Sequence, residues 1–234
     1  MREKELEVQK KAEEMARKKA QENEQKKKSE EEKEDTNNND NETNGMDINS
    51  SSVKNIIIGD SRMVCLCATL NGDWTRCQYS SGGGYDYDNV YFVAQGSMSY
   101  SWFNNTAIAA VNNILSNNTD KKVNIITNMV VNMLLYDVDN YFSKYNELLS
   151  NQWKDKNFII VSVIPVDESK QSQSTYLVRN ADIETFNNKI KNGVSKVKYC
   201  DVYSQIKNNF ETADGVHYMS NTYRMIYQKI LNCI

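Results

Sequence analysis

The stretch VKNIIIGDSR, residues 53–62, decides the fold. Its β-branched run ends in a glycine, a pattern typical of a strand that is buried on both faces of a parallel sheet. A serine directly after such a strand, at the start of a helix, lies at the carboxyl edge of the sheet. Backbone N–H groups point outward there, and the helix dipole favours a developing negative charge. The sequence therefore places Ser61 where an open α/β sheet carries its chemistry.

Four more apolar runs follow along the chain and predict further strands, at residues 90–96, 123–131, 157–165 and 197–203. Amphipathic helical patterns separate most of them, at residues 105–115, 137–153, 180–192 and 220–231. Strands that alternate with helices of this length indicate βαβ units. We therefore expect an α/β fold with a parallel sheet of about five strands, covered by helices on both faces.

The first 52 residues differ from the rest. They contain no aromatic residue, and their 11 Lys/Arg and 15 Asp/Glu make them acidic overall. Such a segment cannot bury enough apolar surface to offset the entropy cost of ordering it. We expect residues 1–52 to be a charged extension, helical or disordered, that ends in an Asn-rich linker. The folded domain then spans residues 53–234.

Charge and hydropathy exclude several classes of function. The domain carries 17 Lys/Arg and 16 Asp/Glu, so we expect no nucleic-acid partner. No apolar run approaches the ~20 residues of a membrane-spanning helix. Met1 leads directly into charged residues, so no signal peptide is expected. The compartment stays unknown: cytoplasmic by default, cell-surface or secreted if the native start lies upstream. We expect a monomer.

The cysteine pattern argues against a metal site. Five cysteines lack a CxxC pair, and the chain has a single histidine, which leaves too few ligands for Cys/His zinc binding. We expect the cysteines to be small buried apolar side chains. We expect no metal and no cofactor.

A second motif, ADGVHY at residues 213–218, precedes the C-terminal helical pattern. Asp214 lies three positions before His217, next to the flexible Gly215. This spacing lets the carboxylate reach the imidazole Nδ1, which leaves Nε2 free to take a proton from a serine. The alternative for Asp214 is a turn or helix-capping aspartate.

Together, these motifs resemble the SGNH (GDSL-like) hydrolases. Gly-Asp-Ser at residues 59–61 and Asp-x-x-His at residues 214–217 match the outer blocks of that family. Gly96 matches the second block and Asn132 the asparagine of the third. The segments GDSR and VIPVDES are most similar to the bacterial Gly-Asp-Ser-Arg members. The resemblance implies a flavodoxin-like, three-layer α/β/α domain.

It also implies roles for single residues. Ser61, Asp214 and His217 would form a catalytic triad, and the oxyanion hole would consist of Ser61, Gly96 and Asn132. The third block departs from the family pattern, because Val130 replaces its glycine and Met133 its aspartate.

Two functions therefore remain open. One is a serine esterase or acyl hydrolase acting on a small-molecule or glycan ester, such as O-acetyl groups on a polysaccharide. The other is a catalytically impaired binding module at the cell surface that keeps the SGNH fold.

Overall fold

The computed structural model describes residues 54–81, 86–87, 89–118, 122–134, 136–171, 177–195 and 197–234. These residues belong to one compact unit. The predicted extension at residues 1–52 lies outside the described residues.

The described residues form a six-stranded sheet in the order β2-β3-β1-β4-β5-β6. Five strands are parallel, and the short β2 pairs antiparallel with β3 at one edge. The predicted parallel sheet of about five strands is thereby confirmed, with β2 as an addition. The strands are β1 (Asn55–Gly59), β2 (Asp86–Tyr87), β3 (Val90–Ala94), β4 (Asn124–Asn128), β5 (Asn157–Val161) and β6 (Lys198–Cys200).

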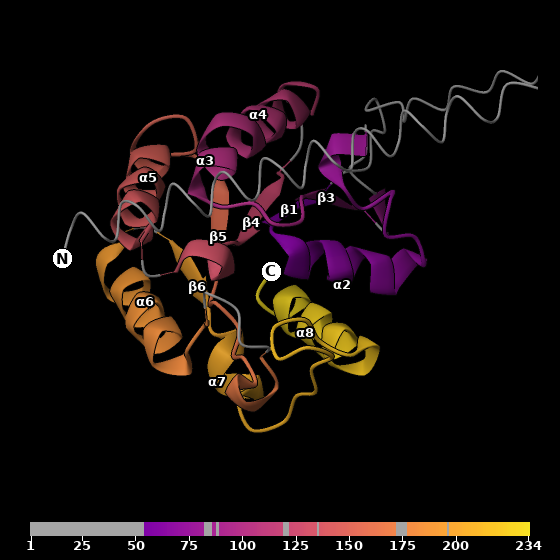
Figure 1. The fold of residues 1–234 in the computed structure, drawn as a ribbon. Coiled ribbons are helices and arrows are strands. Elements are labelled where there is room, and N and C mark those ends of the chain that lie inside the picture. Colours follow the sequence, from indigo (N-terminus) through magenta and orange to yellow (C-terminus); the bar gives the residue numbers. More distant parts are fainter. Residues whose placement is uncertain are drawn as a thin grey trace, which may run out of the picture. The chain divides into compact units, whose positions relative to one another are not determined.

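Helices cover both faces of the sheet, as Figure 1 shows. One face packs against α2 (Ser61–Asn71), α7 (Val202–Ile206) and α8 (Ser220–Leu231). The other packs against α4 (Ile108–Ser116), α5 (Val138–Ser150) and α6 (Asn180–Gly193). Successive side chains of β1 point to opposite faces of the sheet, which explains the two cores. Ile57 packs in the core beside α2, α7 and α8, and its neighbours Ile56 and Ile58 pack in the core beside α4, α5 and α6. The expected α/β/α layering is confirmed.

Several predicted elements differ in their limits. The strands expected at 157–165 and 197–203 end at Val161 and Cys200, and Val202 and Tyr203 belong to α7. The helix expected at 105–115 begins earlier, with α3 (Tyr100–Trp102) and a π-helical stretch η2 (Phe103–Ala107) before α4. The strand expected at 123–131 is too long, because β4 ends at Asn128. Val130 then adopts φ 105°, and a short 3₁₀ helix η3 (Val131–Met133) follows. The apolar run continues past the strand because these valines fill the core, not because they extend the sheet.

Four of the cysteines form disulfides. Cys67 of α2 is bonded to Cys77, and Cys200 of β6 is bonded to Cys233 after α8. Burial is confirmed for Cys67, Cys77 and Cys200, but the sequence analysis did not predict the disulfides, and only Cys65 is a free thiol. Sequence spacing does not reveal the pairing, since each pair is brought together by the packing of separate segments.

Candidate active site

Ser61 begins α2 at the carboxyl edge of the sheet. The side chain of Asp60 caps this helix by accepting a hydrogen bond of 3.0 Å from the backbone N–H of Arg62. Gly59 permits the sharp turn from strand to helix, because a Cβ there would lie 2.1 Å or less from side-chain atoms of Met63. The turn leaves Ser61 8% exposed, with its hydroxyl directed at the loop before α8.

That loop presents Asp214 and His217. Thr212 and Tyr218 form an isolated antiparallel bridge, and the N–H of Ala213 donates to the carbonyl of His217 at 2.8 Å. Within the turn, Asp214 Oδ1 accepts from the backbone N–H of Val216 at 2.9 Å and of His217 at 2.7 Å. The local hydrogen bonds therefore fix the carboxylate before it meets the imidazole.

Gly215 makes this turn possible. Its φ of 90° lies in the left-handed region that favours glycine, and an added Cβ would approach the carbonyl oxygen of Asp167 to 2.7 Å. The N–H of Asp167 also donates to the Gly215 carbonyl at 2.8 Å. The turn is thus packed closely against the segment that follows β5.

The three side chains form a continuous hydrogen-bonded chain. His217 Nδ1 lies 2.7 Å from Asp214 Oδ2, and His217 Nε2 lies 2.9 Å from Ser61 Oγ. Partial burial opposes ionisation of Asp214, but hydrogen bonds from His217 and Val216 outweigh it and lower the pKa of this carboxyl. An ionised carboxylate only accepts, so Nδ1 carries the proton and Nε2 can accept from the serine hydroxyl.

The two chain neighbours of Ser61 are buried side chains that can ionise, Asp60 and Arg62. Burial raises the pKa of Asp60, while Arg62 and backbone N–H groups act in the opposite direction. Arg62 is 1% exposed, donates to the carbonyl of Ile164 at 2.8 Å and lies over the Tyr218 ring. Its guanidinium thus lies beneath the loop that carries His217.

Gly96 and Asn132 lie at the same edge of the sheet, beyond the strands on either side of β1. Both of their donor groups are engaged within the protein. The Gly96 N–H donates to Gln78 Oε1 at 2.9 Å, and Asn132 Nδ2 donates to the carbonyl of Met98 at 2.8 Å. The second bond joins the loop after β3 to the turn after β4. The structure thus gives an internal acceptor to the Gly96 N–H and to one of the two N–H groups of Asn132 Nδ2.

Sequence reasoning missed Gln78 and the burial of Asp60. Asp60 sits in the first motif, and its position between a buried strand and a helix could have indicated a buried cap. Gln78 carried no sequence signal, because it meets Gly96 only after a loop that the Cys67–Cys77 disulfide ties to α2.

Comparisons with known proteins bear on the fold. No family model matches the chain, and no curated protein matches it. Several solved structures are similar to the chain. A protein of Bacteroides fragilis assigned as an acylhydrolase superposes with a TM-score of 0.57 at 15% identity, covering 83% of this chain and 97% of that one.

A protein of Slackia heliotrinireducens assigned as an SGNH hydrolase gives a TM-score of 0.53 at 12% identity, over 78% of this chain and 98% of that one. The chain has the fold of the SGNH hydrolases. The C-terminal catalytic domain of peptidoglycan O-acetyltransferase A of Streptococcus pneumoniae shares this SGNH fold, with a TM-score of 0.52 and 17% identity over 78% and 92% of the two chains.

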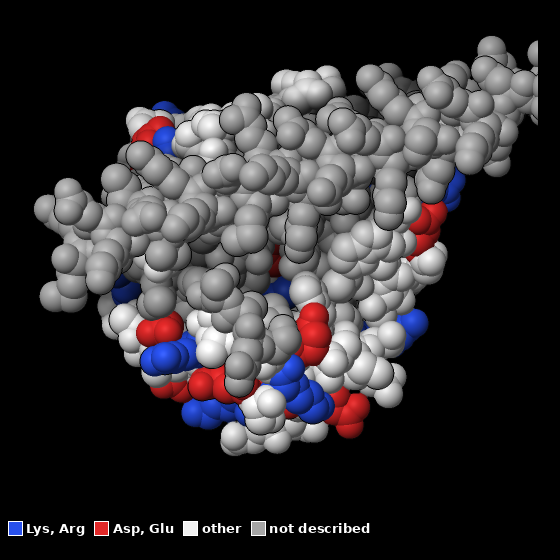
Figure 2. Space-filling model, in the orientation of Figure 1, with Lys and Arg blue, Asp and Glu red and all other residues white. Residues whose placement is uncertain are grey.

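Three further properties of the described residues concern metal binding, membrane insertion and surface charge. No group of three or more potential metal-ligand side chains occurs among the residues that the structure describes. Within the same residues, no helix has the length and apolar character needed to cross a membrane. On the face seen in Figure 2, acidic and basic side chains of the described residues are intermixed.

Proposed function

We propose that the protein is a serine hydrolase that cleaves carboxylic esters, with Ser61, His217 and Asp214 as its catalytic triad. The observation that supports this most directly is the hydrogen-bonded chain from Asp214 through His217 to Ser61. The order of donors and acceptors in it is the order that proton transfer from a serine requires.

The reaction proceeds in two halves. As Ser61 Oγ bonds to the ester carbonyl carbon, its proton moves to His217 Nε2 and the carbonyl oxygen becomes an oxyanion. The intermediate collapses when the bond to the alcohol oxygen breaks and that oxygen takes the proton from Nε2. Water then attacks the acyl-serine, gives its proton to Nε2, and releases the carboxylic acid as Ser61 is reprotonated. Asp214 orients His217 and stabilises the imidazolium in both halves.

The oxyanion needs donors at the point where charge develops. The Ser61 backbone N–H, the Gly96 N–H and the Asn132 amide are the candidates. The Gly96 N–H has to exchange Gln78 for the oxyanion, whereas Asn132 Nδ2 carries a second N–H that can donate while the first stays bonded to Met98. A charged acceptor forms the stronger hydrogen bond, so the developing charge itself favours the exchange.

The test uses the full chain, nitrophenyl esters and a fluorophosphonate probe. We expect ester hydrolysis and one adduct, which mass spectrometry should locate on Ser61. Ser61→Ala should lose both, while Ser101→Ala, an exposed serine of α3, should keep both. Equal turnover by the Ser61→Ala variant would refute the triad.

A second candidate function is a binding module without turnover. The specific observation in its favour is that the Gly96 N–H and one N–H of the Asn132 amide already have internal acceptors. Under this alternative the fluorophosphonate probe would not label Ser61, although an ester ligand would still bind.

We also propose that the protein works in an oxidising compartment. The two disulfides carry this proposal, because such bonds persist in secreted and periplasmic proteins and are rare in a reducing cytosol. Protein purified from its native source should show one titratable thiol per chain after denaturation without reductant. Finding five would contradict the proposal.

A further inference from the structure

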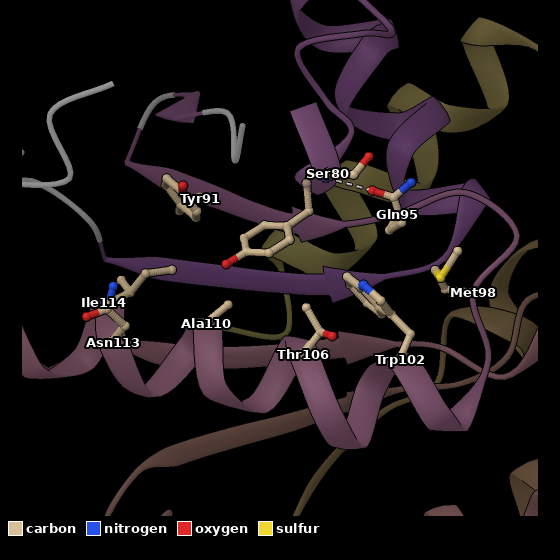
Figure 3. Close-up of a pocket in the computed structure, with 10 residues that line it drawn as sticks. Ser80, Tyr91, Gln95, Met98, Trp102, Thr106, Ala110, Asn113 and Ile114 are labelled. Carbon is tan, nitrogen blue, oxygen red and sulfur yellow. Dashed lines mark hydrogen bonds between the residues drawn. The ribbon is translucent and has the colours of Figure 1, made fainter. Parts of the chain in front are cut away.

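A cavity of about 500 Å³ opens on the α4 face of the sheet (Figure 3). Its walls are β3, the helical segment from α3 to α4, and the turn η1 (Tyr79–Ser81). Gln95 and Met98 line the end at the carboxyl edge of the sheet, and they flank Gly96 in the chain. Asn113 and Ile114 line the opposite end. The cavity therefore begins beside the loop that carries Gly96 and runs along α4.

Contacts within the protein hold the walls in place. Gln95 Oε1 accepts a hydrogen bond of 2.8 Å from the Ser80 N–H, drawn as a dashed line in Figure 3. The rings of Tyr79 and Trp102 meet edge to face, with their centroids 6.3 Å apart. These contacts join η1 to β3 and to α3, so the cavity is formed before a ligand arrives.

The described lining residues are uncharged. Buried apolar or aromatic side chains form the inner surface, including Tyr91, Ala110 and Ile114, each 7% exposed or less. Ser80 and Asn113 are exposed at the rim. A charged ligand group would lose its hydration here without gaining a partner. The lining therefore suits a neutral, largely apolar group.

The volume indicates how large that group is. One water molecule takes about 30 Å³ in the liquid, so the cavity has room for roughly sixteen groups of that size. An acetyl group adds a single methyl to the carbonyl and would leave most of this space unfilled.

The position of His217 decides which part of an ester faces the cavity. Its loop is hydrogen-bonded to the segment after β5, which lies on one side of β1, whereas the cavity adjoins β3 on the other side. The leaving alcohol takes its proton from His217, so it departs on the β5 side. The acyl group is then the part of the substrate that points toward β3.

We propose that this cavity binds the acyl group of the substrate ester, and that this group is an uncharged apolar chain on the order of ten carbons long. The proposal rests on the proposed ester hydrolysis and replaces acetyl as the expected acyl group. Each methylene that enters the cavity leaves water, which raises affinity for the chain by about fourfold.

The first experiment measures kcat/KM for nitrophenyl acetate, butyrate and octanoate. We expect octanoate to be hydrolysed at least tenfold more efficiently than acetate. Ala110→Trp should fill the cavity and lower kcat/KM for octanoate at least tenfold, while acetate stays within twofold. Ala109→Trp is the matched control, because this neighbouring alanine of α4 is exposed, and it should leave both substrates unchanged. Thr106→Phe, at a half-buried lining position, repeats the test if Ala110→Trp does not fold.

The second experiment separates binding from turnover. Calorimetry with the Ser61→Ala protein should show octanoate binding that Ala110→Trp weakens at least tenfold and Ala109→Trp does not. Ester hydrolysis without a preference for longer chains, or equal loss of acetate and octanoate in Ala110→Trp, would overturn the acyl proposal and leave the hydrolase intact. Binding of a xylo-oligosaccharide in place of octanoate would also overturn it. Octanoate binding in a protein that hydrolyses no ester would instead refute the proposed hydrolysis.

Discussion

The two halves of the candidate active site differ in how their polar groups are used. On one side, Asp214, His217 and Ser61 bond to one another in the order that proton transfer needs. On the other side, the donors of Gly96 and Asn132 bond to Gln78 and Met98. If the proposed function holds, Ser61 is ready to react in the free protein, whereas the Gly96 N–H has to exchange its acceptor before it can bind an oxyanion. Substitutions on the first side should lower kcat steeply, and substitutions on the second side should change kcat by smaller amounts.

After the loss of hydrolysis expected for Ser61→Ala, the largest effect should come from Asp214. Asp214→Asn removes the acceptor that keeps the Nδ1 proton in place, so His217 can present a proton to Ser61 instead of a lone pair. We expect kcat to fall by about ten thousandfold. Steady-state kinetics with nitrophenyl esters measures this. Asp155→Asn, in an exposed turn before β5, is the control and should leave kcat unchanged. An equal, small change in both variants would mean that Asp214 only shapes its turn.

The next effect tests the donor side at Asn132. If its amide also donates to the oxyanion, Asn132→Ala should lower kcat by about a hundred- to a thousandfold with little change in KM. Asn128→Ala is the control, since the amide of this buried residue donates to the carbonyl of Ser162 at 2.9 Å. It should reduce thermal stability and leave kcat nearly unchanged. Loss of kcat at Asn128 alone would show that the third block is misaligned.

A smaller effect, in the opposite direction, is expected at Gln78. Gln78→Ala removes the acceptor that holds the Gly96 N–H, and such a neutral bond contributes about 0.5–1.5 kcal/mol. We expect kcat to rise by about two- to tenfold. Gln78→Glu should lower it, because a carboxylate competes more strongly for the N–H. A fall in kcat for both variants would show that Gln78 supports the site.

The smallest effect concerns stability on the donor side. Val130 is 1% exposed and holds φ 105°, a conformation that is costly for a β-branched residue. Val130→Gly loses packing but relieves this strain, so we expect a cost of about 1 kcal/mol or less. Val163→Gly, at a site 2% exposed with ordinary φ, should cost about 3 kcal/mol. Urea unfolding of both variants makes the comparison. Equal costs would mean that the turn at Val130 stores no strain.

The sequence predicted the sheet well, because buried parallel strands are short apolar runs with a β-branched character. β1, β3, β4 and β5 each start within two residues of the expected position. The turn after β4, which carries the third block, was harder to predict. Val130 and Val131 continue the apolar pattern of β4, yet the chain leaves the sheet at Met129, and apolar character alone does not distinguish a strand from a core-filling turn.

The site was predictable to the extent that its residues lie at strand ends. Ser61, Gly96 and Asn132 follow three adjacent strands, and topology alone brings them to one edge. The acceptors Gln78 and Met98 were not predictable, because their positions depend on loop conformation and on a disulfide. The pairing of Cys67 with Cys77 and of Cys200 with Cys233 likewise depends on tertiary packing.

The Cys200–Cys233 disulfide has a mechanical consequence. A pulling force applied at Ile234 enters the fold through Cys233 and passes across the sulfur atoms directly to Cys200 at the end of β6. The intervening segment, which contains the turn of Asp214 and His217, carries no tension. Its 32 residues, one fewer than the separation of 33, would be absent from the extended length on stretching, a shortfall of about 110 Å at some 3.4 Å per residue. A load on the C-terminus would therefore pull on β6 and leave the turn of His217 undisturbed until β6 detaches from β5.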